Sequence, residues 1–261
     1  MFDFHMHTVV SYDGHSTGAE MLVTAERVGL KEICFTDHLD YDPFHPENNM
    51  TFSTEVYNAA YDALDSNKLQ IRRGCEFGML PDNAETLKLD LKRRSFDFVI
   101  GSVHFVNGLD IYLPDFWRGI TIDEAEEKFL LQTLQCVLAH DDFDVLGHLT
   151  YISKAGANPV KRPVEYLRYQ VLIDEILKVL VEKGKGLEIN TSGVDRAGVF
   201  LPAEVYLRRF KELGGEIVTV GSDAHHKNRV GQYCADACEL VREIFGYVCT
   251  FADRKPVFHK L

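Results

Sequence analysis

Short apolar runs alternate with longer amphipathic stretches along the chain. The short runs have the length and apolar character of buried strands. They lie at residues 2–4, 32–36, 69–75, 96–102, 143–147, 186–191 and 216–222. The longer stretches repeat apolar residues at helical spacing, and they predict helices at 19–28, 54–65, 84–93, 122–138, 163–182, 203–213 and 232–245. Glycines just past two of these stretches, Gly29 and Gly214, are typical helix stop signals.

Alternation of strands and helices over the whole chain predicts repeated βα units and a parallel sheet. About seven such units in one domain indicate an α/β fold with a closed or nearly closed barrel. A doubly wound open sheet is the alternative. The 261 residues are enough for one large core. We therefore expect a single domain over residues 1–261, in which 246–261 close the fold and carry no chemistry.

The composition restricts the partners and the compartment. A formal net charge of −12 argues against a nucleic-acid partner, because such surfaces need clustered Lys and Arg. We expect no signal peptide and no membrane span, since the N-terminus lacks a basic segment and no run of about 18 apolar residues occurs. Six scattered cysteines without a CxxC pair indicate reduced core thiols in a cytoplasmic protein. The sequence specifies no oligomeric state.

Histidines and acids follow six separate predicted strands. In a barrel the carboxyl ends of all strands meet at one mouth, so these side chains are expected to converge. A set of unrelated loop histidines is the alternative, but it explains a single histidine better than this repeated placement. The residues at these strand ends are His5, His7, His38, Glu76, His104, His148, Asp223 and His225, and the first loop adds Asp13 or His15.

Imidazole and carboxylate groups without thiolates suit zinc, manganese or iron. One four-coordinate ion uses three or four protein ligands. The nine candidates, counted with Asp13, therefore fit three divalent transition-metal ions with Glu76 as a bridge. Three such ions exceed the charge of Asp13, Glu76, Asp223 and a bridging hydroxide by about two. A phosphate monoester dianion matches this excess, which predicts a small-molecule phosphomonoester substrate.

The same segments resemble the polymerase and histidinol phosphatase (PHP) family of metal-dependent phosphoesterases. They are "HMHTVVSYDG" at 5–14, "FTDH" at 35–38, "GCEF" at 74–77, "GSVHFVNGLDIY" at 101–112, "LGHLTYI" at 146–152, "EINTSG" at 188–193 and "VGSDAHHKNRVG" at 220–231. The segments at 101–112 and 188–193 resemble the stand-alone histidinol-phosphate phosphatase branch in particular. The resemblance implies a distorted seven-stranded, TIM-like (β/α) barrel with a trinuclear metal centre. It also implies hydrolysis of L-histidinol phosphate to L-histidinol and phosphate in histidine biosynthesis.

The resemblance implies a role for each candidate ligand. His5, His7, Glu76 and Asp223 would hold the first ion; Glu76, His104 and His148 the second; and Asp13, His38 and His225 the third. Glu76, Asp223 and His225 are taken as catalytic. Related sequences place either His or Asp in the first loop, and Asp13 is preferred over His15 because it lies six residues past His7. Thr150 departs from the family, where an acid is commoner.

Three further residues are candidates for substrate contact. Arg196 and Arg162 lie in loops and could bind a phosphate through two parallel hydrogen bonds. Trp117, the only tryptophan, could belong to a flap over the mouth or be a packed aromatic. The remaining histidines are taken as incidental: His45, His140, His226 and His259.

We therefore expect a phosphoric monoester hydrolase in which water activated by the ions attacks phosphorus in line. Two alternatives stay open. One is a PHP phosphoesterase acting on a nucleotide or a phosphotyrosyl protein. The other is a non-catalytic metal-binding PHP module, although a structural ion needs no open coordination position for a substrate.

Overall fold

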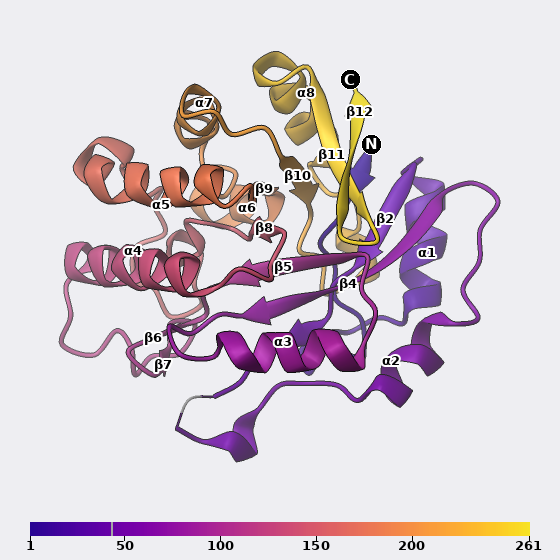
Figure 1. The fold of residues 1–261 in the computed structure, drawn as a ribbon, viewed down its shortest axis with the longest axis horizontal. Coiled ribbons are helices and arrows are strands. Elements are labelled where there is room, and N and C mark those ends of the chain that lie inside the picture. Colours follow the sequence, from indigo (N-terminus) through magenta and orange to yellow (C-terminus); the bar gives the residue numbers. More distant parts are fainter. Residues whose placement is uncertain (43) are drawn as a thin grey trace.

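Seven parallel strands form a nearly closed barrel. The computed structural model describes residues 1–42 and 44–261. Along the sheet the strands follow the order β1 (Phe2–Asp3), β2 (Glu32–Phe35), β4 (Gln70–Gly78), β5 (Phe98–Ser102), β8 (Val145–Leu146), β9 (Gly186–Asn190) and β10 (Val218–Gly221). A short eighth strand, β3 (His38–Leu39), pairs in parallel with the end of β4. Each predicted strand position is confirmed, and the arrangement excludes the doubly wound open sheet (Figure 1).

The first and last barrel strands meet just beyond β1. The amide of Phe4 donates to the carbonyl of Val220 at 2.9 Å, and Met6 forms a parallel bridge with Ala224. These contacts continue the ladder past residue 3, where regular pairing of β1 with β2 ends. The segment that carries His5 and His7 is therefore fixed between two neighbouring strands, and its backbone enters the mouth of the barrel.

Helices lie along the outside of the barrel (Figure 1). They are α1 (Gly18–Arg27), α2 (Thr54–Tyr61), α3 (Ala84–Arg93), α4 (Ile122–Ala139), α5 (Gln170–Glu182), α6 (Val194–Ala197), α7 (Glu204–Glu212) and α8 (Cys234–Ile244). Thr17 and Thr121 begin α1 and α4 with capping boxes, each with a Glu three residues on. The predicted helix at 163–182 begins later than expected, because 166–168 form a separate 3-10 turn. The four-residue α6 was not predicted.

Two antiparallel hairpins are additions to the βα pattern. One joins β6 (Phe105–Val106) to β7 (Leu109–Asp110), and the other joins β11 (Tyr247–Ala252) to β12 (Lys255–Lys260). Both turns have two central residues with positive φ, which are Asn107 and Gly108 in the first. This is the geometry that two-residue hairpins prefer. Neither hairpin was predicted, although Asn-Gly is a strong local signal for one.

The amino end of the barrel is filled by its own small core. Phe4, Phe98, Ile100 and Val145 pack there with Phe251 from β11. The C-terminal hairpin thus covers this end, in agreement with the expectation that 246–261 close the fold. A larger core lies between the sheet and the helices. The candidate donors lie at the opposite end, at the carboxyl ends of the strands.

The six cysteines are all buried and unpaired in the described structure, which fits their prediction as core thiols. Burial raises the pKa of Cys136 to about 12, so this thiol stays protonated at neutral pH. None of the helices in the described ranges combines the length and the apolar character that a membrane crossing requires.

Candidate metal centre

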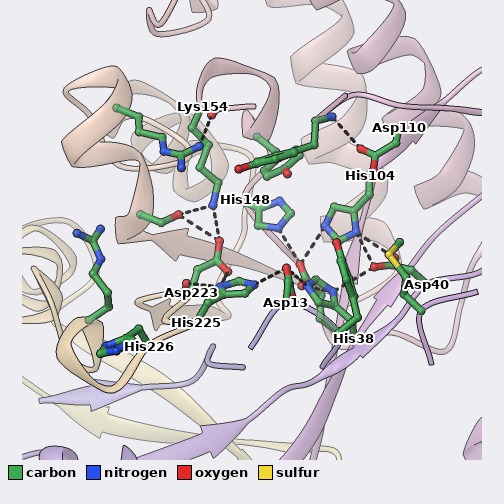
Figure 2. Close-up of a pocket in the computed structure, with 18 of the residues that line it drawn as sticks. Asp13, His38, Asp40, His104, Asp110, His148, Lys154, Asp223, His225 and His226 are labelled. Carbon is green, nitrogen blue, oxygen red and sulfur yellow. Dashed lines mark hydrogen bonds and ion pairs between the residues drawn. The ribbon is translucent and has the colours of Figure 1, made fainter. Parts of the chain in front are cut away.

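The carboxyl ends of the strands open into one cavity of about 750 Å³. Seven of the nine predicted ligands line it, and Figure 2 shows six of these by label. His5 and His7 lie beneath them and are fully buried. The structure therefore brings together the side chains that follow six different strands, as the barrel topology predicts.

His5 and His7 form the floor of the site. Their Nε2 atoms lie 3.0 Å apart, which places both ring nitrogens at one point. The same two nitrogens are 3.3 and 3.4 Å from Glu76 Oε2, and 3.7 and 3.5 Å from Asp223 Oδ1. Alternate residues of an extended segment project to one side, and this explains how two nearby histidines meet two distant acids.

Glu76 is the centre of the cluster. One carboxylate oxygen, Oε1, lies 2.7 Å from His148 Nε2 and 3.4 Å from His104 Nε2. The other, Oε2, lies 3.1 Å from His38 Nδ1 and also faces His5 and His7. Glu76 lies inside β4 rather than after it, because pairing with β3 and β5 extends that strand to Gly78. One carboxylate is thus shared among five imidazoles.

Asp13, His38 and His225 form the outer part of the cluster. Asp13 Oδ2 is 3.0 Å from His225 Nε2 and 3.7 Å from His38 Nε2. The ring of His7 stacks between those of His38 and His225, with centroids 4.1 and 4.2 Å away. His15 also lines the cavity, but its side chain is exposed, whereas Asp13 lies within 3.7 Å of both His38 and His225. The geometry therefore favours Asp13 for this position.

Asp223 reaches the cluster from an unusual backbone conformation. Its φ is +54°, in the left-handed region that Asp tolerates better than most residues. Its amide donates to the carbonyl of His5 at 2.8 Å, so the turn is tied to the first strand segment. Gly221, just before this turn, permits the close approach: a Cβ there would lie 2.3 Å from the Cβ of His5. Strained backbone held in this way is common at functional sites.

Asp40 is a buried acid of this site that the sequence analysis missed. Its carboxylate lies 3.0 Å from His104 Nδ1 and 3.1 Å from His38 Nδ1. A Cβ at position 78 would lie 1.8 Å from Asp40 Oδ1, so Gly78 leaves the space that this side chain occupies. The available signal was its position two residues past His38, which predicts the same side of an extended segment.

The donor atoms form four overlapping groups that fit metal ions. Atoms within each group lie within 4.8 Å of one another. The groups are His7, His38 and His225; His5, Glu76 and His148; His5, His7 and Asp223; and His38, Asp40 and His104. Nitrogen and carboxylate donors in this combination suit zinc and related transition metals.

The pKa values of the clustered histidines show that the buried carboxylates favour positive charge in the site. Burial opposes charge on His5 and His38, but nearby carboxylates raise both pKa values well above the ordinary histidine value. The main carboxylate is Glu188 for His5 and Glu76 for His38. Against the same burial, Asp40 and Glu76 raise the pKa of His104 to about 10. Burial, with His38 and His225 nearby, lowers the pKa of His7. Protonated imidazoles thus balance the acids in the metal-free protein.

Several buried polar atoms of the described cluster make no hydrogen bond, among them Glu76 Oε2, Asp13 Oδ1 and His148 Nδ1. Buried polar groups are rarely left in this state without a reason. Glu76 Oε2 is within 3.4 Å of three ring nitrogens, yet none is aligned to donate to it. This arrangement suits donors that surround a cation, so the residues present fit a metal centre.

A lysine that the sequence analysis did not select lies at the edge of the cluster. Lys154 Nζ contacts Asp223 Oδ2 and lies 2.6 Å from Ser192 Oγ. Beside it, Arg196 Nη1 donates to the carbonyl of Lys154 at 3.3 Å, and the Arg196 side chain lines the cavity. Figure 2 shows Lys154 directed toward Asp223. Two cationic side chains therefore occupy one wall of the cavity.

Arg162 and Trp117, the other two predicted substrate contacts, do not line the cavity, contrary to their expected place at the mouth. Arg162 pairs with Asp123 at 3.0 Å and with Glu126 at 3.3 Å, at the start of α4. Trp117 donates from Nε1 to the carbonyl of Ile111 at 2.8 Å, and its ring packs on the core. Its packed-aromatic alternative is the one observed.

Of the histidines taken as incidental, His226 lines the cavity, where its ring nitrogen accepts from the amide of Asn228. His45, His140 and His259 lie elsewhere, at a loop, a helix end and the C-terminal hairpin.

These features define a metal-dependent hydrolase site on a barrel, and comparison with known proteins identifies its family. The family model for the PHP domain matches residues 3–192. The chain belongs to the PHP family.

Relatives match almost the whole chain. A probable histidinol-phosphatase of Clostridium acetobutylicum is 31% identical over 258 residues, covering 99% of this chain and 96% of that protein. The histidinol-phosphatase of Lactococcus lactis is 29% identical, covering 97% of this chain and 95% of that protein.

Solved structures share the fold. A crystal structure of histidinol phosphate phosphatase from Lactococcus lactis, complexed with zinc, L-histidinol and phosphate, aligns with a TM-score of 0.85. It is 27% identical, and the alignment covers 98% of each chain. A putative histidinol phosphatase from Listeria monocytogenes has a TM-score of 0.73 at 17% identity, covering 90% of this chain and 99% of that one, and supports the fold alone.

Proposed function

We propose that this protein is a metal-dependent phosphatase that hydrolyses L-histidinol phosphate to L-histidinol and phosphate, a reaction of histidine biosynthesis. The observation that carries the proposal is the single carboxylate of Glu76 shared among five imidazoles, beside a wall with two cationic side chains. Such a site combines metal donors with groups that attract phosphate. Full-length similarity to histidinol-phosphatases supports this substrate among phosphomonoesters.

The proposed cofactor is a set of three divalent transition-metal ions. Zinc is the first choice, because the donors are nitrogen and carboxylate and the Lactococcus structure is a zinc complex. Manganese and iron suit the same donors. The proposed ligands are those of the sequence analysis: His5, His7, Asp13, His38, Glu76, His104, His148, Asp223 and His225.

Each part of the chain contributes separately to the proposed reaction. When bound, the ions supply Lewis acidity, which lowers the pKa of water and neutralises phosphate charge. Glu76 and Asp223 hold the donor set together near its floor, and His225 holds its outer part with Asp13. Asp40 holds His104 and His38 from behind. Lys154 and Arg196 attract the phosphate oxygens and orient the ester for attack.

Lys154 has a different proposed partner in the metal-free and in the metal-bound protein: Asp223 in the first and the phosphate in the second. In the metal-free protein its ammonium group neutralises Asp223, and together with His5 and His225 it holds the pKa of that buried carboxyl well below the usual value. With a cation held by Asp223, Lys154 would be free to face a phosphate.

The test is phosphate release by the purified protein, at known metal content, from L-histidinol phosphate, nucleoside monophosphates and aryl phosphates. We expect kcat/KM to be highest for L-histidinol phosphate by at least an order of magnitude. Highest activity on a nucleotide or an aryl phosphate would replace the substrate assignment and keep the phosphatase. Absence of hydrolysis of every ester by metal-loaded protein would favour a non-catalytic module.

A further inference from the structure

The cavity above the metal cluster has two sides of opposite character. Lys154 and Arg196 form one wall, and Asp110 lies on the other. Figure 2 shows Lys154 and Asp110 on opposite sides of His148 and His104. A ligand that spans the cavity therefore meets positive charge at one end and negative charge at the other.

Asp110 differs from the other acids that line the cavity. Five of them lie within about 3 Å of a basic side chain: Asp13, Asp40, Glu76, Asp195 and Asp223, whose nearest partners are His225, His104, His148, Arg229 and Lys154. Among the described residues no basic group forms an ion pair with Asp110. Within the described ranges its carboxylate accepts one hydrogen bond, from the amide of Tyr112 to Oδ1 at 2.8 Å. Oδ2 remains available for a ligand.

The position of Asp110 is fixed by the β6–β7 hairpin. It pairs with Phe105 across the hairpin, and the next residue, Ile111, donates from its amide to the carbonyl of His104 at 3.0 Å. Asp110 is thus held beside a proposed metal ligand and not at the outer rim. Partial burial raises the pKa of its carboxyl.

Apolar surface surrounds this carboxylate. Tyr12, Tyr112 and Leu113 line the cavity, and these residues are 62%, 46% and 52% exposed. Exposed aromatic and aliphatic side chains grouped at a cavity are typical of a ligand contact. This side therefore offers one negative charge and flat apolar surface together.

We infer that Asp110 binds the ammonium group of the substrate and makes the enzyme selective for phosphate esters of amino alcohols. The inference rests on the proposed function. In L-histidinol phosphate the ammonium group is on the carbon next to the ester carbon, so its partner must lie beside the metal cluster. Asp110 meets that requirement without a competing cation. The imidazole of the substrate then lies against the tyrosines.

The test compares two esters that differ only in the ammonium group: L-histidinol phosphate and 3-(imidazol-4-yl)propyl phosphate. Asp110→Asn is nearly isosteric, and its amide oxygen still accepts from Tyr112. We expect kcat/KM of this variant to fall about ten- to a hundredfold for L-histidinol phosphate, the size of one charge-assisted hydrogen bond. For the deamino ester we expect a change of less than about threefold, with metal content unchanged.

Asp195→Asn is the matched control, because Asp195 lines the same cavity but already pairs with Arg229 at 2.5 Å. It should change both esters by the same factor. Equal loss on both esters in Asp110→Asn would overturn the inference and leave the proposed function intact. Equal kcat/KM of the wild type for both esters would overturn it as well. Hydrolysis of neither ester by metal-loaded wild type would mean that the proposed function itself has failed.

Discussion

Glu188 Oε1 lies 2.5 Å from Nδ1 of His5, on the side of the ring away from the metal cluster. Both side chains are fully buried. Glu188 Oε2 also accepts from the amide of His148 at 2.7 Å, so one carboxylate on β9 orients two residues of the site. A carboxylate behind a histidine fixes its tautomer and strengthens the opposite nitrogen as a ligand. This acid begins the segment "EINTSG" at 188–193, and no role was predicted for it.

Glu188→Gln is expected to weaken metal binding about ten- to a hundredfold, the usual effect of losing such a partner. The carboxamide keeps the shape of the side chain but removes the charge that favours the ligating form of His5. Competition with a chelator would measure the affinity. Glu182→Gln, an exposed acid at the end of α5, is the matched control. Unchanged metal retention in Glu188→Gln would show that the carboxylate only supports the fold.

Glu76→Gln is expected to remove more than one ion, because one carboxylate faces five imidazoles. Elemental analysis of the wild type, purified without chelator, should approach three transition-metal ions per chain, and the variant should hold clearly fewer. Turnover should fall by several orders of magnitude. Circular dichroism should be unchanged, since both apolar cores are built from other residues. A saturated wild-type value of one ion would refute the three-ion proposal.

The strand pattern predicted the barrel because a parallel strand buried on both faces leaves a short apolar run in the sequence. It also predicted the convergence of His5, Glu76 and Asp223, since topology alone brings the ends of barrel strands together. Helix boundaries were less accurate where a 3-10 turn intervened, as before Gln170. Local periodicity does not distinguish such a turn from the helix that follows it.

The residues that the sequence analysis missed or misplaced depend on side-chain partners. Lys154 is in the site because its loop turns back over Asp223, and no spacing rule encodes that turn. The sequence placed both Arg162 and Arg196 in loops, but Arg196 lies in α6, and Asp123 and Glu126 of α4 pair with Arg162 away from the cavity. Which acid pairs with an arginine is a tertiary property that local sequence patterns do not encode.

Metal binding is expected to release protons and to strengthen with rising pH. Asp40 and Glu76 outweigh burial and raise the pKa of His104 to about 10, so this ring is protonated at neutral pH in the metal-free protein. It must lose that proton to bind an ion. Zinc titration calorimetry at pH 7.5 in buffers of different ionisation enthalpy should show net proton release. Equal enthalpies in all buffers would contradict it.

The same shift has a consequence for stability without metal. A histidine whose pKa is raised in the folded state stabilises the fold below its unfolded value of about 6.5, and this contribution is lost as pH rises through the folded value. The metal-free protein should therefore lose stability between about pH 6.5 and pH 10. Urea unfolding of chelator-treated protein would measure the decline, and His104→Asn should flatten it.

Arg196 and Arg162 form a matched pair that separates catalysis from folding. Arg196 lines the cavity beside Lys154, and guanidinium binds phosphate through two parallel hydrogen bonds that lysine does not reproduce. Arg196→Ala should lower kcat/KM for L-histidinol phosphate about ten- to a hundredfold, at unchanged metal content and thermal stability. Inhibition by inorganic phosphate should weaken in parallel, and Arg196→Lys should recover only part of the loss.

Arg162→Ala should show the opposite result. Its removal leaves Glu126, which is 4% exposed, without its cationic partner, so the fold should lose about 1–3 kcal/mol. For a chain of this size that is roughly 2–10 °C in Tm. Because Arg162 lies outside the cavity, kcat/KM below the melting range should stay within about twofold of the wild type. Thermal melts and steady-state kinetics on both variants would decide. If Arg162→Ala selectively lost kcat/KM while Arg196→Ala stayed fully active, the assignment of phosphate binding to Arg196 would be wrong.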